Sequence, residues 1–133
     1  MSMQFDSSGT FRYSPKLVGC RSEKWWLVID CDPEIGRFYR SLYTKFHYDT
    51  QFLQRPSWKE HITVVRNEEP ENKSAWEKYN GQIVKFSYNP VIENDDKYFW
   101  LNVKCDFLFE IRLELGLNKD PEFPFHLTIG NKF

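Results

Sequence analysis

The sequence has few cysteines and few histidines, and their spacing excludes several common kinds of site. Three of the 133 residues are cysteines and three are histidines. Cys20, Cys31 and Cys105 are odd in number, lie far apart and form no CxxC pair, which argues against a disulfide framework and against a zinc site. The chain has no HExxH motif and no GxSxG motif either. A zinc hydrolase and an enzyme with a serine or cysteine nucleophile are therefore disfavoured.

Signals for export or for a membrane are also missing. The first residues, MSMQFDSSGTF, have neither the charged region nor the apolar stretch of a signal peptide. No apolar run approaches the ~20 residues that a membrane-spanning helix needs. Together with the unpaired cysteines, this predicts a cytoplasmic protein that does not bind membranes.

The chain has almost no net charge but many aromatic residues. Its formal charge is −1, which argues against a protein that coats nucleic acid without sequence preference, because such binding needs a basic face. A small anionic ligand in a local pocket is still compatible with this charge. Aromatic residues make up 18% of the chain, so some rings could contact nucleobases. The length fits one domain with a sizeable core.

The most informative feature is a His-x-Thr pattern that occurs twice, in EHITVV and in FHLTIG. His61 and Thr63 form the first copy, and His126 and Thr128 form the second. Both runs are apolar and β-branched, as in strands, and side chains two apart on a strand point to the same face. A single copy would indicate little, because a strand histidine beside a threonine is usually a half-buried, hydrogen-bonded residue. The repetition predicts a site.

Two such pairs suit the cleavage of a phosphodiester. One neutral imidazole can remove a proton from the attacking oxygen, and a protonated imidazole can give a proton to the leaving oxygen. Histidine serves both roles because its ordinary pKa is close to neutral pH. Each threonine hydroxyl can donate a hydrogen bond to a non-bridging phosphate oxygen. This chemistry requires no metal and no cofactor.

The two motifs resemble those of the two-histidine (2H) phosphoesterases, the LigT-like or RNA ligase/cyclic phosphodiesterase superfamily. The longer strings WKEHITVVRNEEP and RLELGLNKDPEFPFHLTIGNKF resemble small phage and bacterial members that are RNA-repair-like. The resemblance implies that His61, Thr63, His126 and Thr128 face one another across a cleft. It also implies a substrate with RNA 2′,3′-cyclic phosphate ends or with 2′-5′ or 3′-5′ linkages, including cyclic messengers of antiviral signalling. A phage-encoded member would act in the host cytoplasm.

Periodicity and turn signals predict the order of the elements. The helix after the first strand should begin at Pro33 with Asp32 as its N-cap and end near His47. Residues 1–23 have no clear pattern. The predicted elements are strand 24–31, helix 33–47, strand 60–66, a short helix 70–79, strands 82–91 and 97–105, a helix from Asp106 that stops at Gly116, and strand 125–130.

The two halves share a plan of strand, helix and motif strand. This plan predicts an α+β fold class with two pseudo-symmetric lobes, about 24–80 and 81–133. The resemblance implies that these lobes form a single 2H phosphoesterase domain around a central cleft. Residues near the first motif are further candidates for substrate contact, because loops often carry function. These candidates are Arg55, Trp58, Lys59 and Arg66.

Two alternatives to a phosphodiesterase remain open from the residues alone. In the first, the His-x-Thr pairs are only strand residues of an α+β binding domain. In the second, a noncatalytic sensor keeps the cleft and binds a cyclic nucleotide without cleaving it. The third histidine, His47, belongs to neither motif and is expected at a helix C-terminus, where the helix dipole favours a positive charge.

Overall fold

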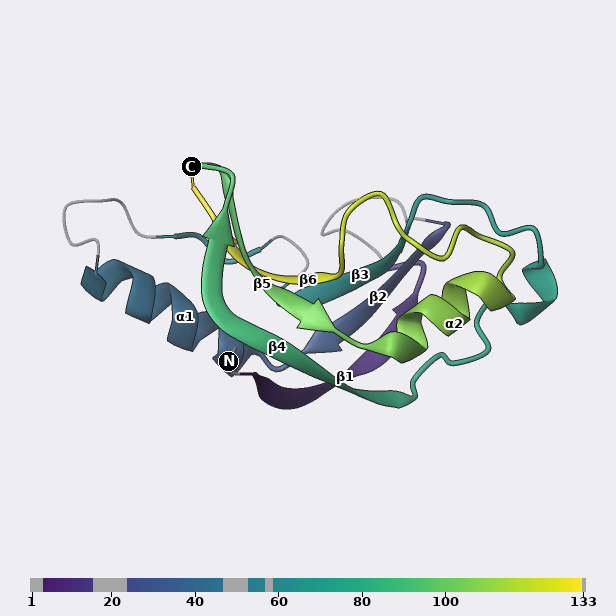
Figure 1. Cartoon of the computed structure of the whole chain (residues 1–133), viewed down its shortest axis with the longest axis horizontal. Coiled ribbons are helices and arrows are strands. Elements are labelled where there is room, and N and C mark those ends of the chain that lie inside the picture. Colours follow the sequence, from purple (N-terminus) through teal and green to yellow (C-terminus); the bar gives the residue numbers. More distant parts are fainter. Residues whose placement is uncertain (1–3, 16–23, 47–52, 57–58, 133) are drawn as a thin grey trace.

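The computed structural model describes residues 4–15, 24–46, 53–56 and 59–132 (Figure 1). Within these ranges the strands form one antiparallel sheet, closed into a barrel in the order β1-β2-β3-β6-β5-β4. The strands are β1 (Phe5–Tyr13), β2 (Trp26–Cys31), β3 (His61–Arg66), β4 (Ile83–Asn94), β5 (Tyr98–Lys104) and β6 (His126–Asn131). The helical elements are α1 (Pro33–Phe46), α2 (Asp106–Glu114) and the 3₁₀ turn η1 (Lys73–Ala75).

The predicted two-lobed α+β fold is wrong, because both halves of the chain contribute to one closed barrel that carries two short helices. β3 from the first half pairs directly with β6 from the second half. β1 lies in the stretch 1–23, where the sequence has no clear pattern, and it pairs with β2 on one side and with β4 on the other. The predicted boundary near residue 80 therefore falls inside the barrel rather than between two lobes.

β1 closes the barrel although its sequence, FDSSGTFRY, has few apolar residues. Only its second half alternates clearly, with Phe11 and Tyr13 buried in the core. Gly9 allows β1 to approach β2 closely, because a Cβ at this position would lie 2.5 Å from the carbonyl oxygen of Asp30. A strand that depends on a close backbone contact and on few apolar side chains leaves little trace in the sequence.

Most of the other predicted elements are confirmed. The predicted helix 33–47 is α1, and the Asp32 carboxylate accepts a hydrogen bond from the backbone N–H of Glu34 at 2.9 Å, as an N-cap does. The predicted strand 82–91 continues to Asn94 as β4, which is strongly curved (Figure 1). His47 lies outside the described residues. The helix predicted over 70–79 is wrong, because only η1 forms and Glu77 has a left-handed backbone with φ 69°.

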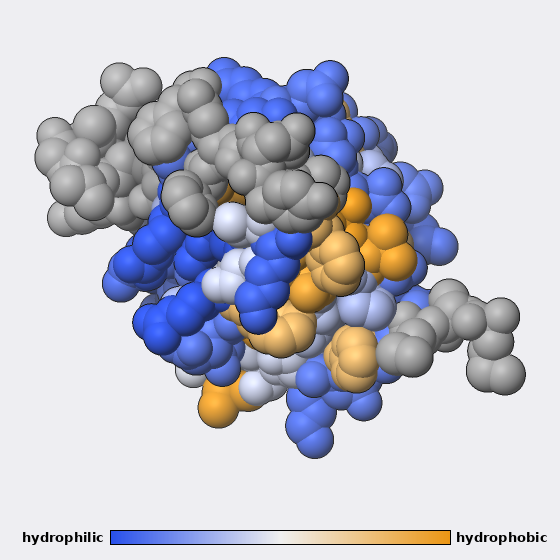
Figure 2. Space-filling view, turned by 90° about the vertical axis from the view of Figure 1, so that its left-hand side faces the viewer, coloured by the Kyte–Doolittle hydropathy of each residue, from blue (hydrophilic) through white to orange (hydrophobic). Residues whose placement is uncertain are grey.

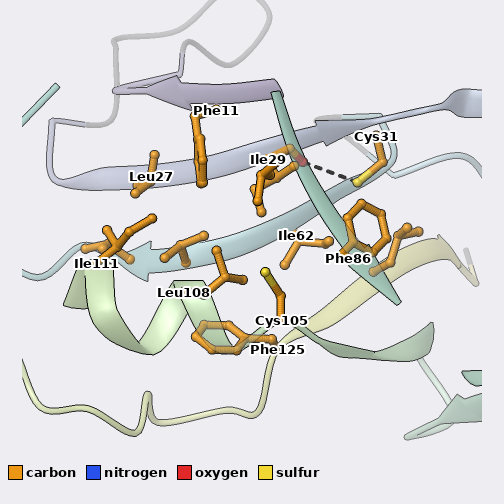
Figure 3. Packing of buried hydrophobic residues seen from close by; sticks show 14 of the residues in the cluster. Phe11, Leu27, Ile29, Cys31, Ile62, Phe86, Cys105, Leu108, Ile111 and Phe125 are labelled. Atoms are coloured by element: carbon orange, nitrogen blue, oxygen red, sulfur yellow. Dashed lines mark hydrogen bonds between the residues drawn. The ribbon is translucent and has the colours of Figure 1, made fainter. Parts of the chain in front are cut away.

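The core lies on one face of the motif strands. Consecutive strands place Ile29, Ile62, Leu127 and Leu101 at neighbouring positions, and each of these side chains is 0% exposed. α2 packs its apolar side onto this cluster (Figure 3). Because strand side chains alternate, the residues before and after this buried row point to the opposite face.

The surface at one end of the molecule is mainly hydrophilic, with a group of adjoining hydrophobic side chains near the centre of the view in Figure 2. The exposed large apolar residues include Phe38 and Phe46 on α1 and Val91 on β4. In the described part of the chain, no helix has the length and apolar character that crossing a membrane requires.

Candidate active site

The two motifs meet because β3 and β6 are neighbours. His61 lies opposite Thr128 in the antiparallel register, and Ile62 lies opposite Leu127. Continuing the same register by one position places Thr63 opposite His126. Each histidine therefore faces the threonine of the other motif, and the two histidines are diagonal neighbours. Diagonal neighbours on an antiparallel pair lie about 7–8 Å apart, so one small group can contact both rings.

The four motif side chains line one cleft of about 630 Å³. The β4–β5 hairpin and the loop before β6 rise on the same side of the sheet, at the upper left and the upper right of Figure 1. Asp95 and Tyr98 at the hairpin contribute to one wall, and Phe123 and Pro124 in the loop contribute to another. The remaining lining residues are Trp26, Pro56, Arg66, Trp100, Asn102 and Asn131.

Both imidazoles are held in the same way. The His61 Nδ1 lies 2.9 Å from the carbonyl oxygen of Lys59, and the His126 Nδ1 lies 2.8 Å from the carbonyl oxygen of Pro124. A carbonyl oxygen can only accept, so Nδ1 carries the proton in both rings. In the neutral ring the lone pair is then on Nε2, which is the nitrogen that can accept a proton. In each motif the orienting carbonyl lies two residues before the histidine.

The surroundings lower the pKa of both histidines below the ordinary value of 6.5. Burial is the main cause for each ring, because it disfavours the charged form. The positive charge of Arg66 lowers both pKa values further, and His126 adds to the effect on His61. The hydrogen bonds to the Lys59 and Pro124 carbonyls act in the opposite direction. Both rings are therefore neutral at pH 7 when the cleft holds no anion.

These lowered pKa values predict a dependence of stability on pH. Below pH 6.5 the unfolded chain binds protons on both histidines while the folded protein resists them, so acidification destabilises the fold. The double variant His61→Gln/His126→Gln lacks both titrating rings. We expect the wild type to lose more stability than this variant as the pH falls from 7 through 6.5 toward the lower pKa values that the histidines have in the folded protein. Urea unfolding of both proteins at a series of pH values measures this. Parallel stability curves would contradict the lowered pKa values.

Among the described residues that line the cleft, Arg66 carries the positive charge. Its guanidinium carbon lies 5.3 Å from the centre of the Trp26 ring and 5.5 Å from the centre of the Phe123 ring. Arg66 also lines a smaller hollow of about 110 Å³ beside the cleft, together with Thr63, His126 and Glu68. Burial lowers the pKa of Arg66, but arginine remains charged at neutral pH. Two aromatic rings thus hold a fixed positive charge next to the motif residues.

The other predicted substrate contacts are placed differently. Arg55 is exposed and is not among the residues that line the cleft, although its neighbour Pro56 is. The side chain of Lys59 is also exposed and outside the cleft lining, so Lys59 acts on the site through its carbonyl. Trp58 lies outside the described residues.

Several residues of the cleft were not predicted. The centre of the Trp100 ring lies 5.8 Å from that of His126, and the Trp100 indole donates a hydrogen bond to the Asn102 side chain at 3.3 Å. Trp100 pairs with Thr128, and Asn102 pairs with His126, on the next strand of the sheet. The alternation in KYFWLNVKC places Tyr98, Trp100 and Asn102 on one strand face, so this pattern could have identified them. Trp26 and Phe123 come from a strand end and a loop, which have no such signal.

In the part of the chain that the structure describes, no group of three or more histidine, cysteine, aspartate or glutamate side chains is arranged so that it could hold a metal ion.

Comparison with known proteins identifies no relative. No protein-family model matches the chain, and searches of curated proteins and of solved structures found no match.

Proposed function

We propose that this protein is a metal-independent phosphodiesterase that acts on a cyclic phosphate or on a short or cyclic oligonucleotide by two-histidine acid-base catalysis. One observation carries the proposal. The register of β3 and β6 pairs His61 with Thr128 and, by continuation, Thr63 with His126, and all four side chains line one cleft. An imidazole and a hydroxyl at each of two diagonal positions form the set of groups that phosphodiester cleavage needs.

The reaction uses the Nε2 atoms of both histidines. One neutral ring accepts the proton of the attacking oxygen, which comes from water or from a ribose hydroxyl. The other ring, in its protonated form, donates a proton to the oxygen that leaves phosphorus. The bond from the attacking oxygen to phosphorus forms as the bond to the leaving oxygen breaks. The Nδ1 hydrogen bonds at 2.9 Å and 2.8 Å keep both rings in the orientation and tautomer that this exchange requires.

Phosphate binding supplies the charge that separates the two roles. Both rings have lowered pKa values, so an isolated cleft would hold two bases and no acid. A bound phosphodiester brings a negative charge close to the rings, which favours the protonated form of one histidine. Thr63 and Thr128 can donate to the non-bridging oxygens. Arg66, held between its two aromatic rings, stabilises charge that develops on them.

The cleft favours a nucleotide of limited length. Its volume of about 630 Å³ is within the range of ~300–1,000 Å³ that is usual for small-molecule sites. Tyr98 and Trp100 on β5 provide aromatic surface near His126, and bases stack on such rings with little regard to sequence. Asn102 and Asn131 line the same cleft and can hydrogen-bond to a base or a ribose. The net charge of −1 makes long RNA a poor substrate.

The proposal predicts turnover that persists when EDTA is present. The purified protein is assayed against 2′,3′-cyclic mononucleotides, cyclic di- and trinucleotides, 2′-5′ oligoadenylate and RNA with a cyclic phosphate end. We expect at least one substrate to be cleaved equally well with and without EDTA, because the imidazoles move the protons. Activity lost in EDTA and restored by zinc or manganese would contradict the mechanism. Tight binding of a cyclic nucleotide without turnover would favour the noncatalytic sensor.

A further inference from the structure

A largely buried arginine of α1, Arg40, connects the two motif strands on the side away from the cleft. One nitrogen of Arg40, Nη1, donates to the Glu60 carboxylate at 2.7 Å and to the carbonyl oxygen of Ile129 at 2.6 Å. The Arg40 side chain is 13% exposed and the Glu60 side chain is 0% exposed. The contact is therefore shielded from water. A charge-assisted hydrogen bond is stronger in such a shielded place than in water.

The positions of these groups relate them to the site. Glu60 comes immediately before His61, and Ile129 comes immediately after Thr128. His61 and Thr128 are the pair that lies opposite each other in the register of β3 and β6. Arg40 thus bonds to the residue next to each member of this pair. A shift of β3 along β6 would break one of its two bonds.

Two glycines make room for this connection. A Cβ on Gly36, one turn before Arg40 on the same face of α1, would collide with the Glu60 carboxylate. A Cβ on Gly130 of β6 would lie 3.4 Å from the Arg40 Cδ and 2.7 Å from the carbonyl oxygen of Gln54. The helix and the strand can approach each other here because both positions lack a side chain.

Stability alone does not explain the pair. The second carboxylate oxygen of Glu60, Oε2, is buried, and no described residue forms a hydrogen bond with it. Burying an unsatisfied carboxylate oxygen is costly. Apolar side chains of similar size often replace a buried ion pair without loss of stability. In other proteins, the best-attested role of a buried ionic group that costs stability is to specify one arrangement of the chain.

We propose that Arg40 and Glu60 are positioning residues for the two-histidine reaction: they fix the register of β3 on β6 and thereby the placement of His61 relative to Thr128. This inference rests on the proposed function. Arg112, which is 1% exposed, bonds to the Val64 carbonyl on β3, to the Glu68 carboxylate and to the Asn118 carbonyl, and none of these three residues lies on β6. Within the described residues, Arg40 is thus the arginine whose bonds reach both motifs.

The test compares stability with turnover. Arg40→Met leaves the Glu60 charge buried, so we expect a lower urea midpoint and a kcat about 10²-fold lower, with a smaller change in KM, because small displacements of catalytic groups have effects of this size. Arg40→Met/Glu60→Leu removes both charges and should recover the urea midpoint but not kcat. Recovery of kcat together with the midpoint would overturn the proposal, since the pair would then be only structural.

Two further variants keep the test decisive if the double variant does not fold. Arg40→Lys retains a charged donor for Glu60, and we expect both its urea midpoint and its kcat to lie above those of Arg40→Met. Val84→Ala removes part of a buried side chain on β4, which pairs with β1 and β5, so it should lower the midpoint and leave kcat unchanged. Equal kcat values for Arg40→Lys and Arg40→Met would contradict positioning by the charged bond.

A readout without substrate separates this inference from the proposed function. The titration of the His61 ring is followed by NMR, with Asp30, Arg66 and His126 as the charged groups that face it. Loss of register in Arg40→Met should expose the ring and move the pKa of His61 up toward its ordinary value, and Val84→Ala should not. If the wild type cleaves no phosphodiester, the proposed function fails while this measurement still tests the positioning. An unchanged His61 titration in Arg40→Met would overturn the positioning role.

Discussion

Replacing either His61 or His126 by alanine is expected to lower kcat by roughly 10²–10⁴-fold on the cleaved substrate, because each general acid or base contributes about this much. The double variant should lose far less than the product of the two single effects, since the rings act on one proton exchange. Thr63→Ala and Thr128→Ala should reduce kcat less than the histidine variants. Steady-state kinetics with matched protein concentrations measure these effects.

The exposed residue Arg37 on α1 provides the control, since Arg37→Ala removes only a surface contact with Glu34. Its kcat should equal that of the wild type.

The pH profile of kcat/KM should be bell-shaped, with apparent pKa values that belong to the coupled pair rather than to one ring. The single histidine variants should each lose one limb of the bell. Near-normal turnover in both single variants would rule out the two-histidine mechanism.

Replacing Arg112 by methionine is expected to lower the free energy of unfolding by about 3 kcal/mol, which is the lower part of the range for breaking a buried ion pair. Arg112 is 1% exposed and donates to both Glu68 carboxylate oxygens, at 2.9 Å and 2.8 Å. It also donates to the Val64 carbonyl at 2.9 Å and the Asn118 carbonyl at 2.8 Å. Because the Glu68 side chain is 34% exposed, water can replace part of the loss.

Urea unfolding of Arg112→Met beside Glu110→Ala, an exposed change on the same helix, measures this effect. The hydrogen bond from Arg112 lowers the pKa of Glu68, so this contact contributes stability above the unfolded-state value of 4.5 and loses it as the pH falls through the folded-state pKa. The difference between wild type and Arg112→Met should therefore shrink in acid. A loss below about 0.5 kcal/mol at pH 7, the size of an ordinary surface change, would contradict the role given to Arg112.

The sequence predicted most local elements because their patterns are strong. Their apolar, β-branched composition identified the motif strands, and the Asp32-Pro33 signal located the start of α1. The spacing of two residues also predicted that His61 and Thr63 share a face, because side chains two apart on a strand point to the same side. The structure brings these residues to one cleft with His126 and Thr128. Their roles in catalysis remain predictions.

The architecture could not be read in the same way, because strand pairing is a long-range property. Two similar halves suggested two lobes, but no local pattern states that β3 lies beside β6. β1 was not predicted as a strand because the serines and the glycine in its middle interrupt the apolar pattern. The predicted helix 70–79 has suitable end signals, yet its backbone forms turn hydrogen bonds between residues three apart, such as that from Trp76 N–H to the Lys73 carbonyl at 3.1 Å, while the Trp76 ring packs 4.9 Å from that of Tyr13. Tertiary contacts thus overrode local propensity.

The length of the β3–β6 ladder has a consequence for how the native state fluctuates. These strands pair at two positions, His61 with Thr128 and Ile62 with Leu127, whereas each other ladder of the barrel extends over at least five. Local opening is easiest where backbone hydrogen bonds are fewest, so amide exchange should be fastest along this seam of the barrel. A substrate that contacts both strands joins them, and its binding free energy therefore also opposes opening of the barrel.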